Sequence, residues 1–370
     1  MSATTADAIV IGAGIVGAAC ARALSRGGRK VLVLEAAVTG SGATAAGMGH
    51  VSLMDDNEPE FLITRYSRDL WIGLVPVLPP AAEYHPCGAI WVAEDEEELD
   101  AARRKHVYCE ARGVKTEVLD AAQLAEAEPN LRPGLSGGLL VPDDLLVYPP
   151  AVAQWMLHQA HAEVWTNASA TSIAKGEVRL ADGRHAHSDV IVCASGISAG
   201  MLVPGIRIRP RKGHLLITDR YPGFVHHQLV ELGYLKSAHG GATESVAFNL
   251  QPRPTGQLLL GSSRQFDVSD PAIDWKILRR MIQRGFDLMP GLRELAVIRA
   301  WTGVRSATDD NQPFVGPVPG MPGVYLAAGH EGLGATTALA VAELVAASVD
   351  GHAPPIPIEP YLPARAMEKA

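Results

Sequence analysis

The sequence predicts an α/β protein in which a parallel-sheet domain is interrupted twice by a second, α+β domain with a mostly antiparallel sheet. Residues 7–35 support this with an apolar strand, a glycine-rich turn, an Ala/Leu helix and a second apolar strand. Residues 324–349 repeat the order of strand, glycine-rich turn and helix. Between these segments, residues 207–299 alternate apolar and polar residues, which is typical of antiparallel strands.

The composition indicates a globular protein without a nucleic-acid surface. The chain has 370 residues, 47% of them hydrophobic and 19% charged, which is enough to bury a large core. Its net charge is -8 and its basic residues are scattered, whereas nucleic-acid binding requires a basic patch. The four cysteines form no C-x-x-C pair, so we predict neither a zinc ribbon nor a redox-active dithiol, and no metal site.

The first residues and the cysteine spacing lead us to expect a cytoplasmic protein. The start of the chain has no basic region, and its first apolar run belongs to the predicted strand, so we expect no signal peptide. No run of about 18 apolar residues occurs, so we expect no transmembrane helix. The cysteine spacing does not require disulfides, which favours a reducing compartment.

The first glycine-rich turn has the spacing of a dinucleotide site. Gly12, Gly14 and Gly17 form a G-x-G-x-x-G motif between an apolar strand and a helix. Gly12 allows the tight turn, Gly14 lets the backbone approach a pyrophosphate, and Gly17 lets helix and strand pack closely. The N–H groups at the start of the helix, at Ile15 and Val16, then face the phosphates. The alternative is a glycine-rich turn that binds no ligand.

The second strand of this unit ends in an acid, and a segment of small residues follows. Glu35 lies about 20 residues after the glycines, where a carboxylate accepts hydrogen bonds from ribose hydroxyls. Residues 39–50 have little to bury and can lie against a bound cofactor, with Thr44 bonding a phosphate oxygen; an ordinary surface loop is the alternative. The cofactor contacts predicted here are Ala36, Ser41, Ala43, Thr44, Gly47, Met48 and Gly49.

Changes of pattern further along predict the other elements and the domain boundaries. We expect a helix over 61–74, a strand over 88–93, an exposed helix over 94–113 that starts with a solvated acid run, a strand over 114–119 and a helix over 121–127. Later strands are expected at 213–218, 246–250 and 257–262, with a helix at 275–288. The first domain is then residues 1–82, 148–206 and 300–370, and the second is 83–147 and 207–299.

Where the chain first returns to the parallel-sheet domain, after residue 147, the sequence predicts another strand that ends at the cofactor site. A helix opened by proline after Tyr148 and a hairpin signal at Asp182-Gly183 lead to an apolar strand at 189–196. Its composition is typical of a buried parallel strand whose carboxyl end faces a ligand crevice. Ala194 and Gly196 are therefore predicted at the cofactor.

Where the chain returns to this domain for the second time, after residue 299, it contains a second glycine-rich turn. The segment Trp301-Thr-Gly303-Val-Arg305 precedes a strand at 324–328 that feeds this turn. The helix that follows presents another N-terminus to the cofactor. The residues predicted here are Gly303, Arg305, Gly329, His330, Glu331, Gly332, Leu333, Gly334, Ala335 and Thr336.

Taken together, these motifs resemble the D-amino-acid oxidase superfamily of FAD-dependent flavoproteins, which includes glycine oxidase and the sarcosine oxidases. The resemblance covers nearly the whole chain. It rests on both glycine-rich turns, on segments 41–47 and 210–214, and on the signature from Trp301 to Gly316. The stretch 47–57 resembles the flavoprotein subunit of bacterial D-hydroxyproline dehydrogenases.

The resemblance implies a Rossmann-like FAD-binding domain of glutathione-reductase type and a substrate domain that roofs the flavin ring. It implies non-covalent FAD, because Ser306 and Ala307 stand where some members attach flavin to a cysteine. It also implies that Arg305 binds a substrate carboxylate, since a planar guanidinium is its best bidentate partner; a structural salt bridge is the alternative. His50 and Tyr234 are further active-site candidates, and a purely structural histidine is the alternative for His50.

The implied reaction is oxidation of a C–N bond next to a carboxylate, by hydride transfer to flavin N5. The expected substrate is D-hydroxyproline (cis-4-hydroxy-D-proline), the product is a cyclic imine, and the acceptor is a quinone or dye. The alternatives are a glycine, sarcosine or D-amino-acid oxidase that uses oxygen, an FAD-carrying subunit that is inactive without partners, and an NAD-linked dehydrogenase. Homo-oligomers, partner subunits and peripheral membrane association stay open.

Overall fold

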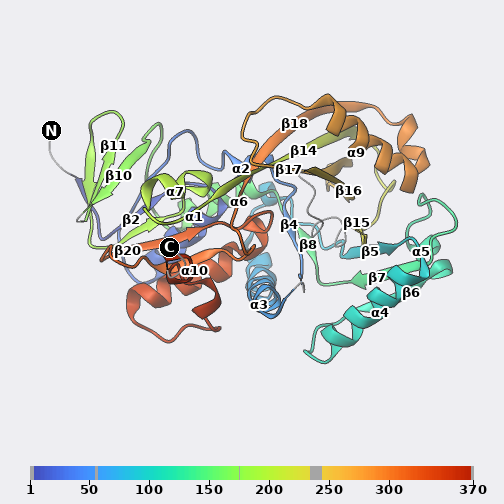
Figure 1. The fold of residues 1–370 in the computed structure, drawn as a ribbon, viewed down its shortest axis with the longest axis horizontal. Coiled ribbons are helices and arrows are strands. Elements are labelled where there is room, and N and C mark those ends of the chain that lie inside the picture. Colours follow the sequence, from blue (N-terminus) through green and yellow to red (C-terminus); the bar gives the residue numbers. More distant parts are fainter. Residues whose placement is uncertain (1–3, 55–56, 175, 234–243, 368–370) are drawn as a thin grey trace. The chain divides into compact units, whose positions relative to one another are not determined.

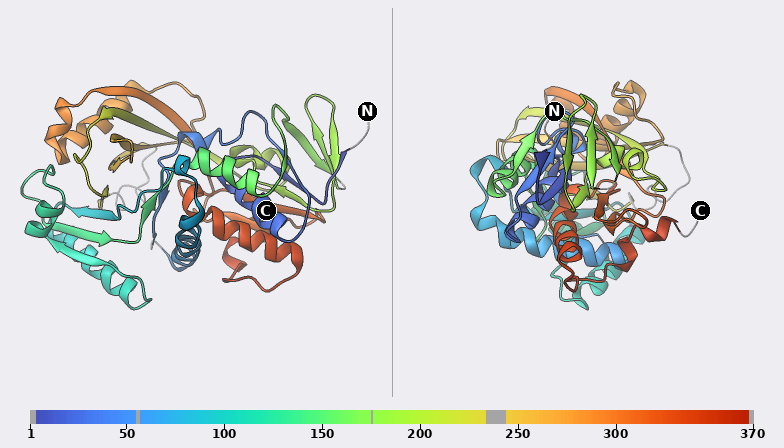
Figure 2. Two further views of the ribbon diagram at one scale, coloured as in Figure 1. Left: turned by 180° about the vertical axis from the view of Figure 1, so that it is seen from behind. Right: turned by 90° about the vertical axis from the view of Figure 1, so that its left-hand side faces the viewer.

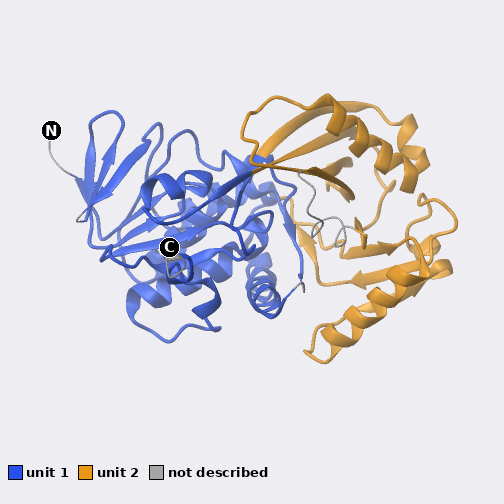
Figure 3. Ribbon diagram, viewed as in Figure 1, with its two compact units in different colours: residues 1–82, 147–210, 304–370 blue, residues 83–146, 211–303 orange. Residues whose placement is uncertain are grey.

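The computed structural model describes residues 4–54, 57–174, 176–233 and 244–367. It divides into two compact units, which Figure 3 shows in different colours. Unit 1 comprises residues 1–82, 147–210 and 304–370, and unit 2 comprises residues 83–146 and 211–303. Each unit is therefore assembled from segments that lie far apart in the sequence.

Unit 1 is built on a six-stranded sheet with the order β19-β20-β13-β2-β3-β9. All neighbouring pairs are parallel except β19 and β20, which are antiparallel. The elements of this unit are β1 (Thr4–Thr5), β2 (Ala8–Ile11), α1 (Ile15–Arg26), β3 (Val31–Leu34), α2 (Ala43–Ala46), β4 (His50–Val51), α3 (Glu58–Leu74), α6 (Pro149–Gln159), β9 (Glu163–Trp165), β10 (Ala170–Ala174), β11 (Glu177–Leu180), β12 (His185–His187), β13 (Ile191–Cys193), α7 (Ala199–Leu202), β19 (Phe314–Pro317), β20 (Val324–Ala328), α10 (Gly334–Asp350) and α11 (Ala364–Met367), with short 3-10 turns at Val75–Val77, Pro80–Ala82, Gly196–Ser198 and Glu359–Tyr361.

Layers cover both faces of this sheet, as Figures 1 and 2 show. On one face α1 packs against β2, β3 and β13, and it also contacts α6 and α10; α3 packs on α10. On the other face lies a four-stranded sheet with the order β1-β12-β11-β10. Ile9 and Leu32 of the large sheet share a buried core there with Val178 and Ala186 of the small one. Every residue of β2 is consequently buried, as expected for a parallel strand covered on both faces.

Unit 2 contains an eight-stranded sheet with the order β18-β14-β17-β16-β15-β5-β7-β6. Of the strand pairs described, only β5 with β15 is parallel. Its elements are β5 (Ala89–Ala93), α4 (Glu96–Glu110), β6 (Glu117–Asp120), α5 (Ala121–Ala127), β7 (Gly137–Val141), β8 (Leu145–Leu146), β14 (Arg209–Arg220), β15 (Gln228–Glu231), β16 (Glu244–Pro252), β17 (Gln257–Phe266), α9 (Trp275–Leu288), a 3-10 turn (Pro290–Glu294) and β18 (Val297–Ala307). Strands β14 and β18 run across the boundary between the units. The mostly antiparallel sheet expected from the alternating pattern is confirmed.

Several predicted elements are confirmed to the residue, and others differ at their ends. The helices at 121–127 and 275–288 and the strand at 324–328 have the expected bounds. The helix expected over 94–113 is shorter, because the Asp95 side chain accepts the N–H of Glu98 and so starts the helix at Glu96. The four cysteines are buried and free. In the described part of the chain, no helix combines the length and apolar character needed to cross a membrane.

Candidate cofactor and active site

The first glycine-rich turn is packed so tightly that side chains have no room. Gly12 has a φ of +105°, and a Cβ there would lie 2.5 Å from the carbonyl oxygen of Ala194. A Cβ on Gly17 would lie 1.9 Å from the carbonyl oxygen of Gly12. The end of β2, the end of β13 and the first turn of α1 thus meet through bare backbone. This places the predicted residues Gly12, Gly14 and Ala194 together.

The N-terminus of α1 has no side-chain cap of its own. Gly14 is the capping residue, and the N–H groups of Val16 and Gly17 in the first turn lack acceptors within the helix. The N–H of Ile15 donates instead to Thr44 Oγ1, at 3.0 Å. Thr44, predicted as a phosphate contact, therefore uses its oxygen to hold the start of the helix, and its O–H is the group with which it can donate to a phosphate.

Glu35 is held in place by backbone donors on both sides. Its Oε2 accepts the N–H of Ala13 at 2.7 Å, and its Oε1 accepts the N–H of Ala37 at 2.8 Å. Its side chain is buried, yet a carboxylate has acceptor capacity for about four hydrogen bonds. The acid is therefore fixed beside the glycine-rich turn and can still accept ribose hydroxyls. The sequence motif did not reveal the backbone groups of Ala13 and Ala37 that fix it, since any residue type supplies them.

The segment after Glu35 leads from this turn to the start of α10. Gly49 has a φ of +84°, and a Cβ there would lie 2.0 Å from the carbonyl oxygen of Val147. The carbonyl of His50 then accepts the hydroxyl of Thr336 at 3.0 Å. His50 is thus tied by its backbone to the second glycine-rich region. Of the other predicted residues here, Ala36, Ala43 and Gly47 are exposed and Ser41 and Met48 are half-buried.

The second glycine-rich turn also leads into a helix whose N-cap residue makes no side-chain hydrogen bond. Gly329 has a φ of +83°, and a Cβ there would lie 2.5 Å from Cγ2 of Thr308. Helix α10 has 17 residues, no side-chain hydrogen bond at its N-cap Leu333, and first-turn N–H groups at Gly334 to Thr336 without acceptors in the helix. This helix start therefore offers partial positive charge and N–H donors to an anionic group.

Arg305 lies beside this second turn. The N–H of Glu331 donates to the carbonyl of Ser306 at 2.8 Å, which ties the end of β18 to the turn. A Cβ on Gly332 would lie 3.6 Å from Nε of Arg305, an ordinary van der Waals distance. The half-buried guanidinium group therefore runs along the bare backbone of Gly332, next to the start of α10.

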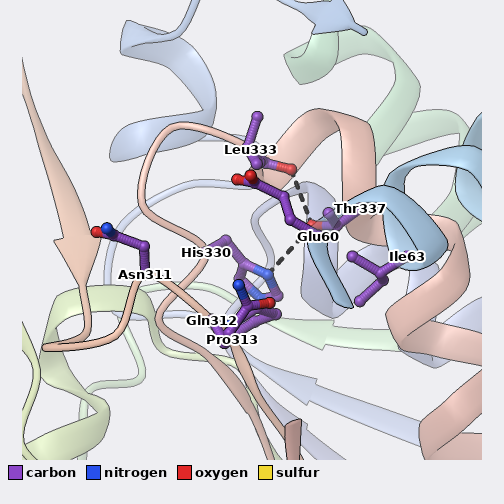
Figure 4. Close-up of a pocket in the computed structure, with 8 residues that line it drawn as sticks. All are labelled: Glu60, Ile63, Asn311, Gln312, Pro313, His330, Leu333 and Thr337. Atoms are coloured by element: carbon purple, nitrogen blue, oxygen red, sulfur yellow. Dashed lines mark hydrogen bonds between the residues drawn. The ribbon is translucent and has the colours of Figure 1, made fainter. Parts of the chain in front are cut away.

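His330 lies in a small pocket behind the turn, shown in Figure 4. Its Nδ1 is 3.2 Å from the hydroxyl of Thr337, which itself donates to the carbonyl of Leu333 at 2.8 Å. The pocket is also lined by Glu60, Ile63, Asn311, Gln312 and Pro313. Burial lowers the pKa of His330 from 6.5 to about 4, so its ring is neutral near pH 7 and holds the turn.

This buried histidine makes the stability depend on pH. The unfolded chain binds a proton at this ring below pH 6.5, whereas the folded chain resists protonation until pH falls to about 4. Acid therefore favours the unfolded state, and about 3 kcal/mol of unfolding free energy is lost across this window. We expect His330→Gln to show a smaller loss between pH 7 and pH 4 than the wild type, measured by denaturant unfolding. A control His158→Gln at an exposed histidine should keep the wild-type slope; equal slopes in all three proteins would contradict the assignment.

Gly303 and Tyr234 stay predictions. Gly303 belongs to unit 2, whereas the two glycine-rich turns and Arg305 belong to unit 1. Tyr234 lies outside the described residues. Gly196 has a φ of +58° and open space where a Cβ would stand. The site in unit 1 therefore consists of two groups, one around Gly12, Glu35 and Thr44 and the other around Arg305 and the start of α10.

The residues present fit a dinucleotide cofactor. Two long helices that pack against each other both begin at an N-cap residue whose side chain makes no capping hydrogen bond, and each follows a glycine-rich turn that closes on bare backbone. An oriented acid, Glu35, stands beside the first turn. These features define a dinucleotide-binding protein of the α/β class.

The comparisons identify the family within that class. The family described as "DAO: FAD dependent oxidoreductase" matches residues 7–348, so the chain belongs to this family of FAD-dependent oxidoreductases, and FAD is its cofactor. The glycine oxidase of Bacillus licheniformis is 26% identical over 366 residues, which cover 94% of this chain and 93% of that protein. The hydrogen cyanide synthase subunit HcnC of Pseudomonas aeruginosa is 24% identical and covers 98% of this chain and 96% of its own length.

Solved structures share the fold. The glycine oxidase of Geobacillus kaustophilus superimposes with a TM-score of 0.87 at 23% identity, covering 97% of this chain and 98% of that one. The L-proline dehydrogenase of P. horikoshii gives a TM-score of 0.88 at 22% identity, covering 100% and 99%. The Rossmann-like FAD-binding domain with a second, mostly antiparallel domain is therefore confirmed.

Proposed function

We propose that this chain oxidises the C–N bond of a small amino or imino acid, with D-hydroxyproline (cis-4-hydroxy-D-proline) as its substrate and a cyclic imine as product. The observation that carries the proposal is the position of Arg305 beside Gly332 and the uncapped start of α10. A planar guanidinium group is the best bidentate partner for a carboxylate. A substrate carboxylate bound at Arg305 is held by the charge and the N–H donors of this group, next to the helix start that faces the cofactor.

The protein's share of the chemistry is binding and orientation. The reaction removes two electrons and two protons from the substrate, one hydrogen from carbon and one from nitrogen, and leaves a C=N bond. Bound FAD supplies the two-electron acceptor. Arg305 fixes the carboxylate, so that the adjacent C–H bond is presented in one orientation. The residues that would hold FAD are the first turns of α1 and α10, Glu35 and Thr44.

The substrate choice rests on the resemblance of stretch 47–57 to D-hydroxyproline dehydrogenase subunits. Asp55 and Asp56 of this stretch lie outside the described residues. Asn57 caps α3 by accepting the N–H of Glu60 at 2.9 Å, and it also accepts a hydrogen bond from Gln312 at 3.1 Å. Its role is thus structural. The named activities of the relatives, on glycine and proline, support a small amino or imino acid.

A substrate panel tests the proposal. We expect cis-4-hydroxy-D-proline to give a kcat/KM about tenfold or more above those of glycine and sarcosine, because an enzyme distinguishes ring size and a hydroxyl by this order. The panel contains D- and L-proline, cis- and trans-4-hydroxyproline, sarcosine and glycine, each assayed with a dye acceptor. Preference for glycine or sarcosine would reject the hydroxyproline assignment but keep the amino-acid class.

The electron acceptor distinguishes the proposed dehydrogenase from a second candidate function, an amino-acid oxidase that uses oxygen. The glycine oxidase relatives favour this second candidate. Fast turnover in air with peroxide production identifies the oxidase, whereas turnover with a quinone or dye alone identifies the dehydrogenase. A purified chain that holds FAD but turns over no member of the panel would instead favour a subunit that needs partners, as the relation to HcnC suggests. We propose a cytoplasmic location for either enzyme.

A further inference from the structure

The small four-stranded sheet of unit 1 carries three side chains of metal-ligating type that the cofactor site does not use. Strands β11 and β12 are antiparallel, and Glu177 stands directly opposite His187. His185 lies two residues earlier on β12, so its side chain is on the same face as that of His187. Ala186 between them is fully buried in the core on the other face. The pattern thus directs both imidazoles and the carboxylate to the outer face of the sheet.

The three side chains are close enough to share one ion. Nε2 of His187 is 3.2 Å from Oε2 of Glu177. The rings of His185 and His187 lie edge to face, with their centroids 5.6 Å apart. One nitrogen or oxygen from each of the three residues lies within 4.8 Å of the others. Zinc binds such atoms at about 2.0–2.2 Å, which brings neighbouring ligands to about 3.4 Å, so small side-chain rotations complete the site.

A fourth residue orients the carboxylate. Nε of Arg179 donates to Oε1 of Glu177 at 2.5 Å, which leaves Oε2 directed to His187. The carboxylate is therefore fixed through its other oxygen, which is how supporting residues commonly hold a metal ligand.

We propose that Glu177, His185 and His187 bind one divalent transition-metal ion of the Zn²⁺ type on the surface of unit 1. Two imidazoles and a carboxylate are a donor set that zinc accepts, and the partial exposure of the three residues lets water complete the coordination. The ion links β11 to β12, and β12 continues into β13, whose end packs on the first glycine-rich turn. The bound ion therefore stabilises the four-stranded sheet, which covers one face of the six-stranded sheet. This proposal revises the expectation of no metal site.

Zinc titration of the untagged, FAD-loaded protein tests the site. At slightly alkaline pH, calorimetry with Zn²⁺ alone should show one ion bound per chain. Glu177→Gln, His185→Gln and His187→Gln should each weaken this binding about tenfold or more, since even loss of a supporting residue costs that much. The matched control is His158→Gln/His161→Gln, at the other surface histidine pair of unit 1, whose ring centroids are 6.5 Å apart. The control should bind Zn²⁺ like the wild type.

A spectroscopic measurement reports the ligands directly. With one equivalent of Cu²⁺, the paramagnetic resonance spectrum should show coupling to two imidazole nitrogens in the wild type and to one in His185→Gln or His187→Gln. Flavin absorbance per chain should be unchanged in every variant and serves as the check on folding. Equal Zn²⁺ affinity in the wild type and all three ligand variants would overturn the proposal, as would loss of binding in the control variant alone.

Discussion

Replacing Arg305 with alanine should lower kcat/KM for the preferred amino acid on the order of 10²-fold or more. The reason is that the substrate carboxylate loses a charge-assisted, bidentate partner in a half-buried position. Arg305→Lys keeps the charge but loses the planar fork, so its kcat/KM should fall between those of the wild type and the alanine variant. Steady-state kinetics with a dye acceptor measures all three proteins.

Two controls separate substrate binding from other causes. Arg299→Ala removes an exposed arginine from the same strand, where it lies over the ring of Trp301, and should leave kcat/KM unchanged. Flavin absorbance per chain shows whether Arg305→Ala still carries FAD. An alanine variant with full flavin content and wild-type kcat/KM would exclude Arg305 as the carboxylate anchor.

Replacing Gly17 with alanine should abolish FAD binding and destabilise the chain by more than about 3 kcal/mol. The new Cβ would stand 1.9 Å from the carbonyl oxygen of Gly12, so α1 has to move away from the turn that it presents to the phosphates. The measurements are flavin absorbance per chain and the denaturant midpoint.

The matched control makes the same substitution in another helix. Gly73 of α3 is exposed, has no atom within 4 Å of its would-be Cβ, and has no positive φ. Gly73→Ala should therefore keep FAD and gain up to about 1 kcal/mol from the better helix propensity of alanine. If Gly17→Ala bound FAD as well as Gly73→Ala does, the close approach of α1 to the turn would not be needed for the cofactor.

The sequence predicts those parts of the site that depend on backbone rules. The positions of Gly12 and Gly17 are dictated by sterics that only glycine satisfies, and the tight turn and the close packing of helix on strand expected there are present. Helix α9 was predicted to the residue because its apolar periodicity is strong and Asp274 caps it. Local rules of this kind can be recognised directly in the order of residues.

Contacts between segments that lie far apart in the sequence cannot be predicted from such local patterns. The acid run starting at Glu94 was expected to be a solvated helix start, yet Glu94 forms ion pairs with Arg132 and Arg284. The sequence predicts that the hydroxyl of Thr44 bonds a phosphate, but it does not reveal that the same oxygen accepts the N–H of Ile15. The Glu177, His185 and His187 group depends on the register of two strands, which the sequence leaves open.

The interleaving of the two units constrains how the protein is made. The chain passes between the units at residues 82–83, 146–147, 210–211 and 303–304. Ile9 in the strand before the first glycine-rich turn pairs with Ile191, which pairs in turn with Val324. On the ribosome, the cofactor sheet therefore stays incomplete until almost the whole chain has been synthesised. Unpaired strand edges are exposed during that time, so we expect nascent chains to need protection from aggregation.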